Sequence, residues 1–564
     1  MLRHCAFLVL FNESKDLMSG FCMKEKLRLV FLTVNSSYSH SSLALPLLHS
    51  ACRELKQWEW FRYDTTLDCD IMTAVQELYS LKGDLLVTDL YLFNRKTALE
   101  ILRRYHSLDT QCRIAAGGPE CLGDGAAQLL QECPWLDRVF RGEGEGIFRE
   151  YLLAFNEISS VPHIVPQEGN AVFQEWENAP CPVADPFFVT DKPFIQMETS
   201  RGCPMKCFYC TSGNTQIRYR SMEQVREELQ MLAAKGIQEI RVLDRTFNLP
   251  QERGAALLRM FREEFPQIRF HLELHPQFLG EDLRSELEKA LPGQLHIEVG
   301  IQCLDADVQR LSGRNSRRDA VLDGLDFLCK QKTFETHADL LAGLPGQTWE
   351  HITRDAATLM LYQTAEIQLE ILKVLPGTPM REIAPAHGIC YCPDTPYDVM
   401  KSETMTVEEI QQVRALSRLL DLTYNHKALH LPVLTMSREC PDFILRLLNH
   451  FQQTGGTVQT VWNLQKRFFF LLDFCRKYGL KQGATSLAYH WLLAGFPPGE
   501  GPDVYSRKAD NIPENAVLHS GSADCLTARE TRCWQLSMNG EVIYLAYNRS
   551  FAPNRPAAIW IAPE

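Results

Sequence analysis

The chain has 564 residues and a net charge of −12, with 58 Lys and Arg against 70 Asp and Glu. This acidic balance argues against an electrostatic grip on nucleic acid or on an anionic membrane. The 19 cysteines are too sparse for a disulfide scaffold, and no run reaches the ~18 apolar residues of a membrane span. We therefore expect a cytoplasmic protein of several domains, in which clustered cysteines bind metal or take part in catalysis.

The first part of the chain alternates between two kinds of segment. Residues 1–23 precede the first clear element and are expected to be an extension without a secretory signal. Over residues 24–156, apolar segments of strand length lie at 27–34, 58–63, 84–89, 113–118 and 138–141, and helical patterns lie at 42–55, 71–81, 96–106, 124–132 and 146–156. This alternation predicts an α/β fold with a doubly wound, Rossmann-like parallel sheet, which binds ligands at the carboxyl ends of its strands.

A second alternating series follows a break. Residues 157–193 contain six prolines and are predicted to form an extended linker. Within residues 194–385, strands are expected at 194–199, 238–243, 268–274, 295–301, 335–341 and 367–374, with helices at 221–235, 251–265, 281–289, 318–331 and 347–361. Six βα units in a row indicate a partial (β/α)6 barrel.

The last part, residues 386–564, has a mainly helical pattern. Helices are expected at 406–424, 440–454 and 460–479, and the first of these begins with a capping box, Thr406 with Glu409. A strand-like segment lies at 541–547. We infer a mainly helical domain of unknown role.

One cysteine cluster stands out, with the spacing CxxxCxxC at Cys203, Cys207 and Cys210, directly after the first strand of the second series. Three thiolates from one loop can hold three irons of a 4Fe-4S cluster and leave the fourth iron open to a ligand. Lys206 and Arg201 would supply positive charge beside them. The alternatives are a zinc knuckle or a chance grouping of buried cysteines. A zinc site needs a fourth ligand nearby, and the chain has no further Cys or His before position 271.

The loop, its place after the first barrel strand and the tyrosine before its last cysteine resemble the radical S-adenosylmethionine (radical SAM) superfamily over residues 194–381. The resemblance implies that S-adenosylmethionine chelates the open iron and is cleaved by one electron to methionine and a 5′-deoxyadenosyl radical. It also implies S-adenosylmethionine contacts from one residue of the cysteine loop and four residues of the later strands: Tyr209, Asp244, Glu298, Gln302 and Gly343.

Several of these residues have simpler explanations. Asp244 could cap the helix that begins near residue 250, Glu298 could pair with Arg269, and Tyr209 could be a core aromatic. His271 and His275, on the third barrel strand, could be acid–base groups, substrate contacts or ordinary polar residues of the barrel mouth.

The N-terminal sheet carries a second resemblance. The fragments 89–94, 116–120 and 141–146 are similar to the cobalamin-binding domain of the cobalamin-dependent radical SAM enzymes. Paired glycines after a strand allow a bulky ligand to approach the backbone. The resemblance implies cobalamin contacts from residues of the three loops: Tyr91, Asn94, Gly117, Gly118 and Glu143.

The Asp-x-His-x-x-Gly motif, which supplies a lower axial histidine in some cobalamin proteins, is absent. His40 lies in the corresponding loop after the first strand. We expect it to be a residue of the cobalamin pocket, with cobalt ligation and a role near the helix start as alternatives.

The two resemblances together imply a cobalamin-dependent radical SAM methyltransferase. One S-adenosylmethionine would methylate the reduced cobalamin and another would yield the radical that activates an inert centre of a small molecule or peptide. The reducing electron would come from a donor such as ferredoxin or flavodoxin.

Other functions stay open. The same cofactors serve ring contraction or cyclisation without net methyl transfer, and a degenerate barrel would suit a cobalamin or redox sensor. A tRNA methylthiotransferase is disfavoured because the acidic chain shows no basic stripe in its C-terminal region.

Overall fold

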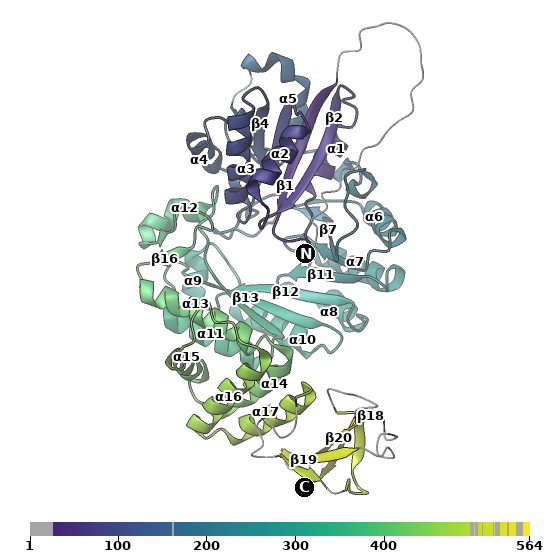
Figure 1. Cartoon of the computed structure of the whole chain (residues 1–564), viewed down its shortest axis with the longest axis vertical. Coiled ribbons are helices and arrows are strands. Elements are labelled where there is room, and N and C mark those ends of the chain that lie inside the picture. Colours follow the sequence, from purple (N-terminus) through teal and green to yellow (C-terminus); the bar gives the residue numbers. More distant parts are fainter. Residues whose placement is uncertain are drawn as a thin grey trace.

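The computed structural model describes residues 26–160, 163–496, 501, 506–509, 511–522, 524, 531–538, 541–548 and 556–563. The predicted extension 1–23 lies outside these residues. From the N-terminal end, a parallel sheet with its helices is followed by an open barrel, a group of helices and a small sheet (Figure 1). No helix among the described residues is long and apolar enough to cross a membrane.

The N-terminal sheet is parallel, with strand order β2-β1-β3-β4-β5-β6. Successive residues of its strands enter separate cores on its two faces: Val30 and Leu32 pack in one, Leu29 and Phe31 in the other. This two-sided burial confirms the doubly wound prediction. The strands are β1 Leu27–Asn35, β2 Trp58–Thr66, β3 Leu85–Asp89, β4 Arg113–Gly117, β5 Arg138–Phe140 and β6 Ile164–Val165, and the helices are α1 Ala44–Cys52, α2 Ile71–Ser80, α3 Arg95–Leu108, α4 Gly125–Glu132 and α5 Gly144–Leu153.

The sixth strand is a correction to the sequence-based prediction, which gave five strands and treated 157–193 as an extended linker. Ile164 and Val165 pair in parallel with Val139 and Phe140 at the edge of the sheet. A two-residue strand followed by Pro166 leaves no periodic signal. The sheet therefore extends into the predicted linker.

The central unit is an open parallel barrel of order β14-β13-β12-β11-β10-β7, as predicted, so that β7 and β14 form its two edges. Along β12 buried apolar residues alternate with partly exposed polar residues or glycine, which places His296, Glu298 and Gln302 on one face and Ile297 and Val299 in the core under the helices. The strands are β7 Ile195–Met197, β10 Glu239–Val242, β11 Arg269–Leu274, β12 Leu295–Gln302, β13 Glu335–Ala342 and β14 Glu366–Ile371, and the helices are α6 Met222–Ala234, α7 Gln251–Glu264, α8 Glu281–Glu288, α9 Ala306–Leu311, α10 Arg318–Lys330 and α11 Trp349–Leu361.

The helices after the barrel include two that the sequence did not predict. α14 (Lys427–Glu439) contains Pro432 in its interior, which removes the expected helical signal. α17 (Lys481–Leu493) is buried on several faces, so it lacks an apolar stripe. The remaining elements are α12 Pro379–Ile383, β15 Cys390–Tyr391, β16 Val399–Lys401, α13 Val407–Leu422, α15 Phe443–Gln453 and α16 Leu464–Tyr478.

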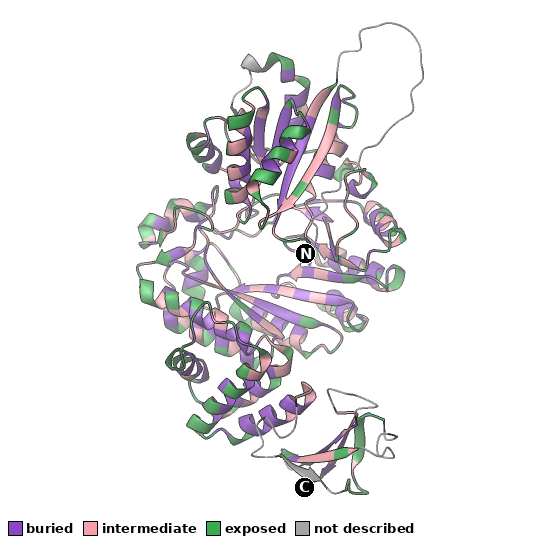
Figure 2. Cartoon of the chain, viewed as in Figure 1, coloured by how far each residue is buried: buried purple, intermediate pink, exposed green. Residues whose placement is uncertain are grey.

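The C-terminal sheet is antiparallel, with order β17-β19-β20-β21-β18. Its strands are β17 Ser506–Ala509, β18 Val517–Gly521, β19 Arg532–Met538, β20 Glu541–Tyr547 and β21 Ala558–Pro563. The predicted strand 541–547 is β20. In Figure 2 buried residues follow the strands of both parallel sheets and fill the group of helices between the barrel and this small sheet.

Candidate active site

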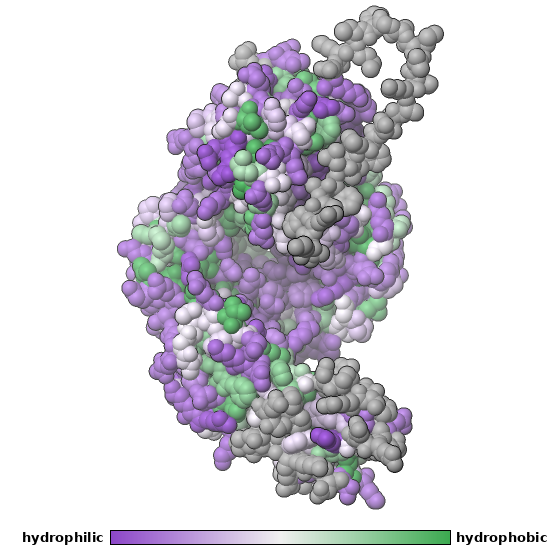
Figure 3. Space-filling model, in the orientation of Figure 1, coloured by the Kyte–Doolittle hydropathy of each residue, from purple (hydrophilic) through white to green (hydrophobic). Residues whose placement is uncertain are grey.

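A cavity of about 720 Å³ lies between the N-terminal sheet and the mouth of the barrel. One wall comes from loops at the carboxyl ends of β3, β4 and β5, including Tyr91, Gly118 and Glu143, and the other from the barrel side, including Arg201 and Arg245. Figure 3 shows the molecule hollowed between these two parts. Parallel strands gather ligand-binding loops at their carboxyl ends, and here two such edges face one another.

The cysteine loop leaves the barrel through a short hairpin, β8 (Ser200–Arg201) with β9 (Arg218–Tyr219). Cys203 and Cys207 are buried and Cys210 is half-buried, and all three are free thiols. The Cys203 N–H donates to Thr215 Oγ1 over 2.9 Å, and the Thr215 N–H returns a bond of 2.9 Å to the Cys203 carbonyl. The base of the loop is thus fixed by its own backbone.

Among the described residues, no three Cys, His, Asp or Glu side chains converge tightly enough to hold a single metal ion. The fit to a 4Fe-4S cluster rests on donor chemistry, with three thiols on one eight-residue loop. Burial and the neighbouring Cys203 and Cys207 raise the pKa of Cys210, and Arg245 opposes this rise. A bound 4Fe-4S cluster would supply the positive charge that these thiolates need.

Asp244 is buried beneath this loop, and hydrogen bonds from the chain occupy both oxygens of its carboxylate. Its carboxylate accepts hydrogen bonds from the Thr199 N–H at 2.7 Å, the Thr199 hydroxyl at 2.5 Å and the Ser200 N–H at 2.9 Å. It does not cap the helix at Pro250, where no side-chain cap forms. Its contacts are those of a residue that holds the turn before the cysteines.

Arg314 is a buried residue of this site that the sequence did not predict. Its guanidinium lies 3.8 Å from the Cys207 sulfur, donates to the Tyr209 hydroxyl over 3.4 Å and donates to the Gly300 carbonyl. The only local signal is the preceding Gly313, which has φ of 68° and whose added Cβ would lie 2.3 Å from the Lys206 carbonyl. That close approach brings the α9 loop against the cysteine loop.

Of the three roles that the sequence leaves open for His275, namely an acid–base group, a substrate contact or an ordinary polar residue, its contacts favour the last. Burial and then Arg314 lower the pKa of His275 to about 3. Its ring instead packs in the same polar group, 3.3 Å from the Arg314 guanidinium and 3.2 Å from the Ser316 hydroxyl.

Glu298 lies on the inner wall of the barrel, and its partner is His271 at 2.9 Å rather than Arg269. The hydrogen bond with His271 lowers the pKa of Glu298 to about 2. On the next strand, Asp339 lies 3.2 Å from His337, and burial raises the pKa of Asp339 to about 7. The inner wall is therefore a row of interacting histidines and carboxylates.

Two predicted S-adenosylmethionine contacts have unusual backbone geometry. Gln302 has φ of 65° at a bulge in β12, and its buried Oε1 has no hydrogen-bond partner among the described residues. Gly343 has φ of 93°, and its N–H donates to the Gln347 side chain over 2.9 Å. Gln302 is thus free to meet a ligand, whereas Gly343 serves the turn after β13.

The predicted cobalamin contacts separate into two groups. Tyr91, Gly117, Gly118 and Glu143 line the cavity. Gly118 has a left-handed φ of 100°, and a Cβ added here would lie 2.7 Å from the Leu90 carbonyl. Packing within the chain therefore already requires glycine at this position.

Asn94 and His40 do not belong to the cavity lining. Asn94 is buried at the start of α3 and donates to the carbonyls of Val34 and Asp89. His40 bonds to Ser37 at 2.9 Å and packs edge-on against Phe194, 5.2 Å between ring centroids. The Asn94 side chain is thus bound at the ends of β1 and β3, and the His40 ring to its own loop and to the residue before β7.

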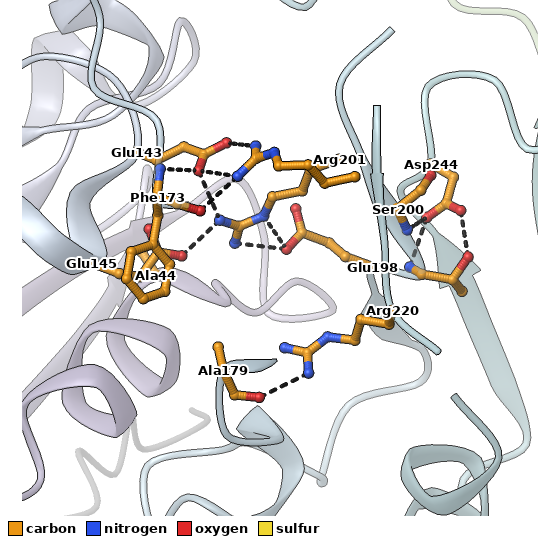
Figure 4. A network of polar contacts seen from close by, with 12 residues as sticks. Ala44, Glu143, Glu145, Phe173, Ala179, Glu198, Ser200, Arg201, Arg220 and Asp244 are labelled. Carbon is orange, nitrogen blue, oxygen red and sulfur yellow. Dashed lines mark hydrogen bonds and ion pairs between the residues drawn. The ribbon is translucent and has the colours of Figure 1, made fainter. Parts of the chain in front are cut away.

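Glu143 is held in an ion-pair network that joins the two walls (Figure 4). It accepts from Arg218 at 3.0 Å and from the Phe173 N–H at 2.7 Å. Arg201, two residues before Cys203, contacts Glu145 and Glu198 at 2.8 Å each and Glu143 at 3.6 Å. These carboxylates raise the pKa of Arg201 above its usual range. The N-terminal sheet is thereby tied directly to the cysteine loop.

Trp176, from the segment between β6 and β7, completes this network. It is fully buried, and its ring lies 5.0 Å from the Arg201 guanidinium, 5.1 Å from that of Arg220 and 6.0 Å from that of Arg218. The electron-rich indole ring attracts each of these cations. The predicted linker therefore supplies part of the interface.

Comparison with known proteins bears on the same regions. The family model described as the radical SAM superfamily matches residues 197–359, and a model described as a protein of unknown function, DUF4080, matches residues 385–494. An uncharacterized methyltransferase of Pyrococcus horikoshii, PH0819, is 28% identical over 316 residues, which is 50% of this chain and 67% of that protein. The cobalamin-dependent radical SAM methyltransferase TokK of Streptomyces tokunonensis is 21% identical over 399 residues, 63% of this chain and 58% of that protein.

Methylthiotransferases are also similar, for example the tRNA-2-methylthio-N(6)-dimethylallyladenosine synthase of Herpetosiphon aurantiacus, 25% identical over 236 residues, 39% of this chain and 52% of that protein. Among solved structures, the cobalamin-dependent S-adenosylmethionine radical enzyme OxsB, with aqua-cobalamin and S-adenosylmethionine bound, has a TM-score of 0.57 at 13% identity, over 83% of this chain and 79% of that chain. At this identity the likeness establishes the fold. Residues 197–359 thus match the radical SAM superfamily model and residues 385–494 the DUF4080 model, and the chain shares the overall fold of OxsB.

Proposed function

We propose that this protein is a cobalamin-dependent radical SAM methyltransferase that acts on a small molecule or a peptide. The observation that carries this proposal is the shared cavity. The glycine slot at Gly117 and Gly118 and the cysteine loop flanks at Gly202 and Thr211 line the same space of about 720 Å³. A corrin in the slot and a cluster on the loop would therefore face one substrate.

In this proposal Cys203, Cys207 and Cys210 hold the 4Fe-4S cluster, and Asp244 keeps the turn before them in place. Tyr209, Glu298 and Gln302 are the proposed S-adenosylmethionine contacts of the barrel wall. When bound, the cluster and S-adenosylmethionine supply the radical and cobalamin carries the methyl group.

This chain's own residues would hold these groups in fixed relation. The Arg201 network joins the two walls, and a closed interface between them keeps water from the radical. An external electron donor such as ferredoxin or flavodoxin completes the proposal.

A second candidate is methylthio transfer, which the similarity to methylthiotransferases over 236 residues favours. A third is cofactor use without net methyl transfer, as in ring contraction or cyclisation. Product mass separates all three, because the substrate gains a methyl group, a methylthio group or neither.

The test is anaerobic reconstitution with iron, sulfide and hydroxocobalamin, followed by reduction with S-adenosylmethionine present. We expect 5′-deoxyadenosine from the wild type and none above background from Cys203→Ala, Cys207→Ala or Cys210→Ala, because each thiol is one of three cluster ligands. Cys329→Ala, a half-buried cysteine on α10 outside the cavity, is the matched control and should retain wild-type yield. Equal yield from all three loop variants would exclude the radical mechanism.

A further inference from the structure

Asp89 is an acidic residue of the cavity that none of the proposed roles uses. It is the last residue of β3, at the carboxyl end of the sheet, and it lines the cavity beside Tyr91 and Gly118. Its side chain is almost fully enclosed, with 4% of the residue exposed. The position is therefore the floor of the slot rather than its rim.

The two oxygens of this carboxyl group differ in their hydrogen bonds to the chain. The Ser42 hydroxyl donates to Oδ2 over 2.6 Å. Oδ1 is buried and accepts no hydrogen bond from any described residue. A buried acceptor without a donor costs roughly 1–3 kcal/mol, and more when it is charged, so such an atom calls for a partner.

The protein supplies no cation to compensate Asp89. Across the described part of the chain, Asp89 takes part in no ion pair of 4.0 Å or less, whereas Glu143 and Glu145 in the same cavity both pair with arginine. Burial, reinforced by the nearby Asp64, raises the pKa of Asp89 to about 6. A buried carboxyl group that lines a ligand cavity and lacks both a cation and a second hydrogen-bond donor is expected to receive a donor from a bound ligand.

We propose that Asp89 is a cofactor-binding residue, whose carboxylate accepts a hydrogen bond from the cobalamin bound in the slot. This inference rests on the proposed function. Cobalamin offers two kinds of donor: the amide N–H groups at the edge of the corrin and a water coordinated to cobalt. His40, the polar residue expected for this pocket from the sequence, lies elsewhere.

The role has a chemical consequence beyond binding. A carboxylate in a site of low dielectric stabilises positive charge nearby. If the donor is the cobalt-bound water, Asp89 would lie close enough to cobalt to favour its more oxidised, more positively charged states.

The experiment uses the full-length protein and hydroxocobalamin as the probe. Binding is measured by equilibrium dialysis for the wild type, Asp89→Ala and Asp89→Asn, with circular dichroism and thermal melting to confirm folding. We expect Asp89→Ala to weaken binding by roughly 10-fold or more, the loss of one hydrogen bond to a charged acceptor. Asp89→Asn, which keeps a neutral acceptor, should fall between it and the wild type.

Two further variants test whether the loss of binding is specific to the Asp89 carboxylate. Asp84→Asn changes an exposed carboxylate just before the other end of β3, where it accepts from the Arg28 N–H, and should bind as the wild type does. Ser42→Ala removes the hydrogen bond that holds Oδ2 but keeps the carboxylate, so binding should weaken by less than in Asp89→Ala.

Electron paramagnetic resonance of the bound cob(II)alamin distinguishes the two donors. A change from five to four coordination in Asp89→Ala identifies the cobalt-bound water, and an unchanged spectrum with weakened binding identifies a corrin amide. Binding within twofold of wild type together with an unchanged spectrum would overturn the role of Asp89 and leave the proposed function intact. A wild-type protein that binds no hydroxocobalamin would overturn both.

Discussion

The two walls of the central cavity are built in different ways. On the barrel side, Asp244 has both carboxylate oxygens occupied, and the cysteine loop is closed by two hydrogen bonds between Cys203 and Thr215. On the sheet side, Asp89 keeps an unpartnered oxygen and the glycine turn presents bare backbone. The turn that carries the cysteine loop is thus organised before any ligand arrives, whereas the floor of the slot is completed by what binds there.

This difference follows from what each wall has to hold. A cluster ligated by three thiols needs fixed sulfur positions, which only a rigid loop can supply. A large organic cofactor brings its own donors and acceptors, so a slot can leave polar atoms for it to satisfy. Because the arginine network joins the two walls, the arrangement of each wall depends on that of the other.

The largest effect is expected from a substitution that destabilises the barrel wall and leaves the sheet wall unchanged. Asp244→Ala removes three hydrogen bonds from a buried turn and should cost about 3 kcal/mol of unfolding free energy. Iron content after reconstitution should fall severely, while hydroxocobalamin binding on the opposite wall persists. Asp282→Ala, on the exposed start of α8, is the control. Normal iron content in Asp244→Ala would show that the turn is organised by other contacts.

Removing the Arg201 ion pairs that connect the two walls should have the next largest effect. Arg201→Gln leaves Glu145 and Glu198 without a cation in a buried setting and should cost about 2–3 kcal/mol. Both iron content and cobalamin binding should decline, because the residue belongs to both walls. Arg226→Gln, which breaks surface ion pairs, should cost at most about 1 kcal/mol. An effect of Arg201→Gln on one cofactor only would mean that the walls are independent.

The inner barrel wall should show a smaller, pH-dependent effect. The folded protein holds the pKa of Asp339 near 7, above the ordinary value of 3.8, so folding takes up a proton and stability falls as pH rises from about 4 to 7. Asp339→Asn removes this penalty and should stabilise the protein by about 1 kcal/mol at pH 8, with less gain at pH 5. Thermal melting at the two pH values measures the difference. A gain that does not depend on pH would indicate altered packing instead.

The smallest effect is expected at His40. Because its ring packs on Phe194 and lies outside the cavity lining, His40→Ala should leave hydroxocobalamin affinity and the cob(II)alamin spectrum unchanged. Spectra and dialysis of the variant against the wild type measure this. A spectral change would restore His40 as a residue of the corrin pocket.

Features encoded by local pattern could be predicted from the sequence. The strands of both parallel sheets other than β6 follow from apolar runs of strand length, and the CxxxCxxC loop follows from the reach of three thiols on one short segment. Short-range periodicity and motif spacing need no knowledge of distant residues. The same holds for β20, whose apolar run is visible in the sequence.

Features that depend on distant partners were decided only by the tertiary structure. The strand β6 exists because its two residues reach the edge of β5, and α17 is helical with little amphipathic pattern because several of its faces are buried. Arg314 meets the cysteine loop across more than a hundred residues of sequence. The sequence by itself thus determined the fold class and the three thiols. Which polar groups the chain satisfies internally, as at Asp244, and which it leaves for a ligand, as at Asp89, depends on burial and on contacts between segments far apart in the chain.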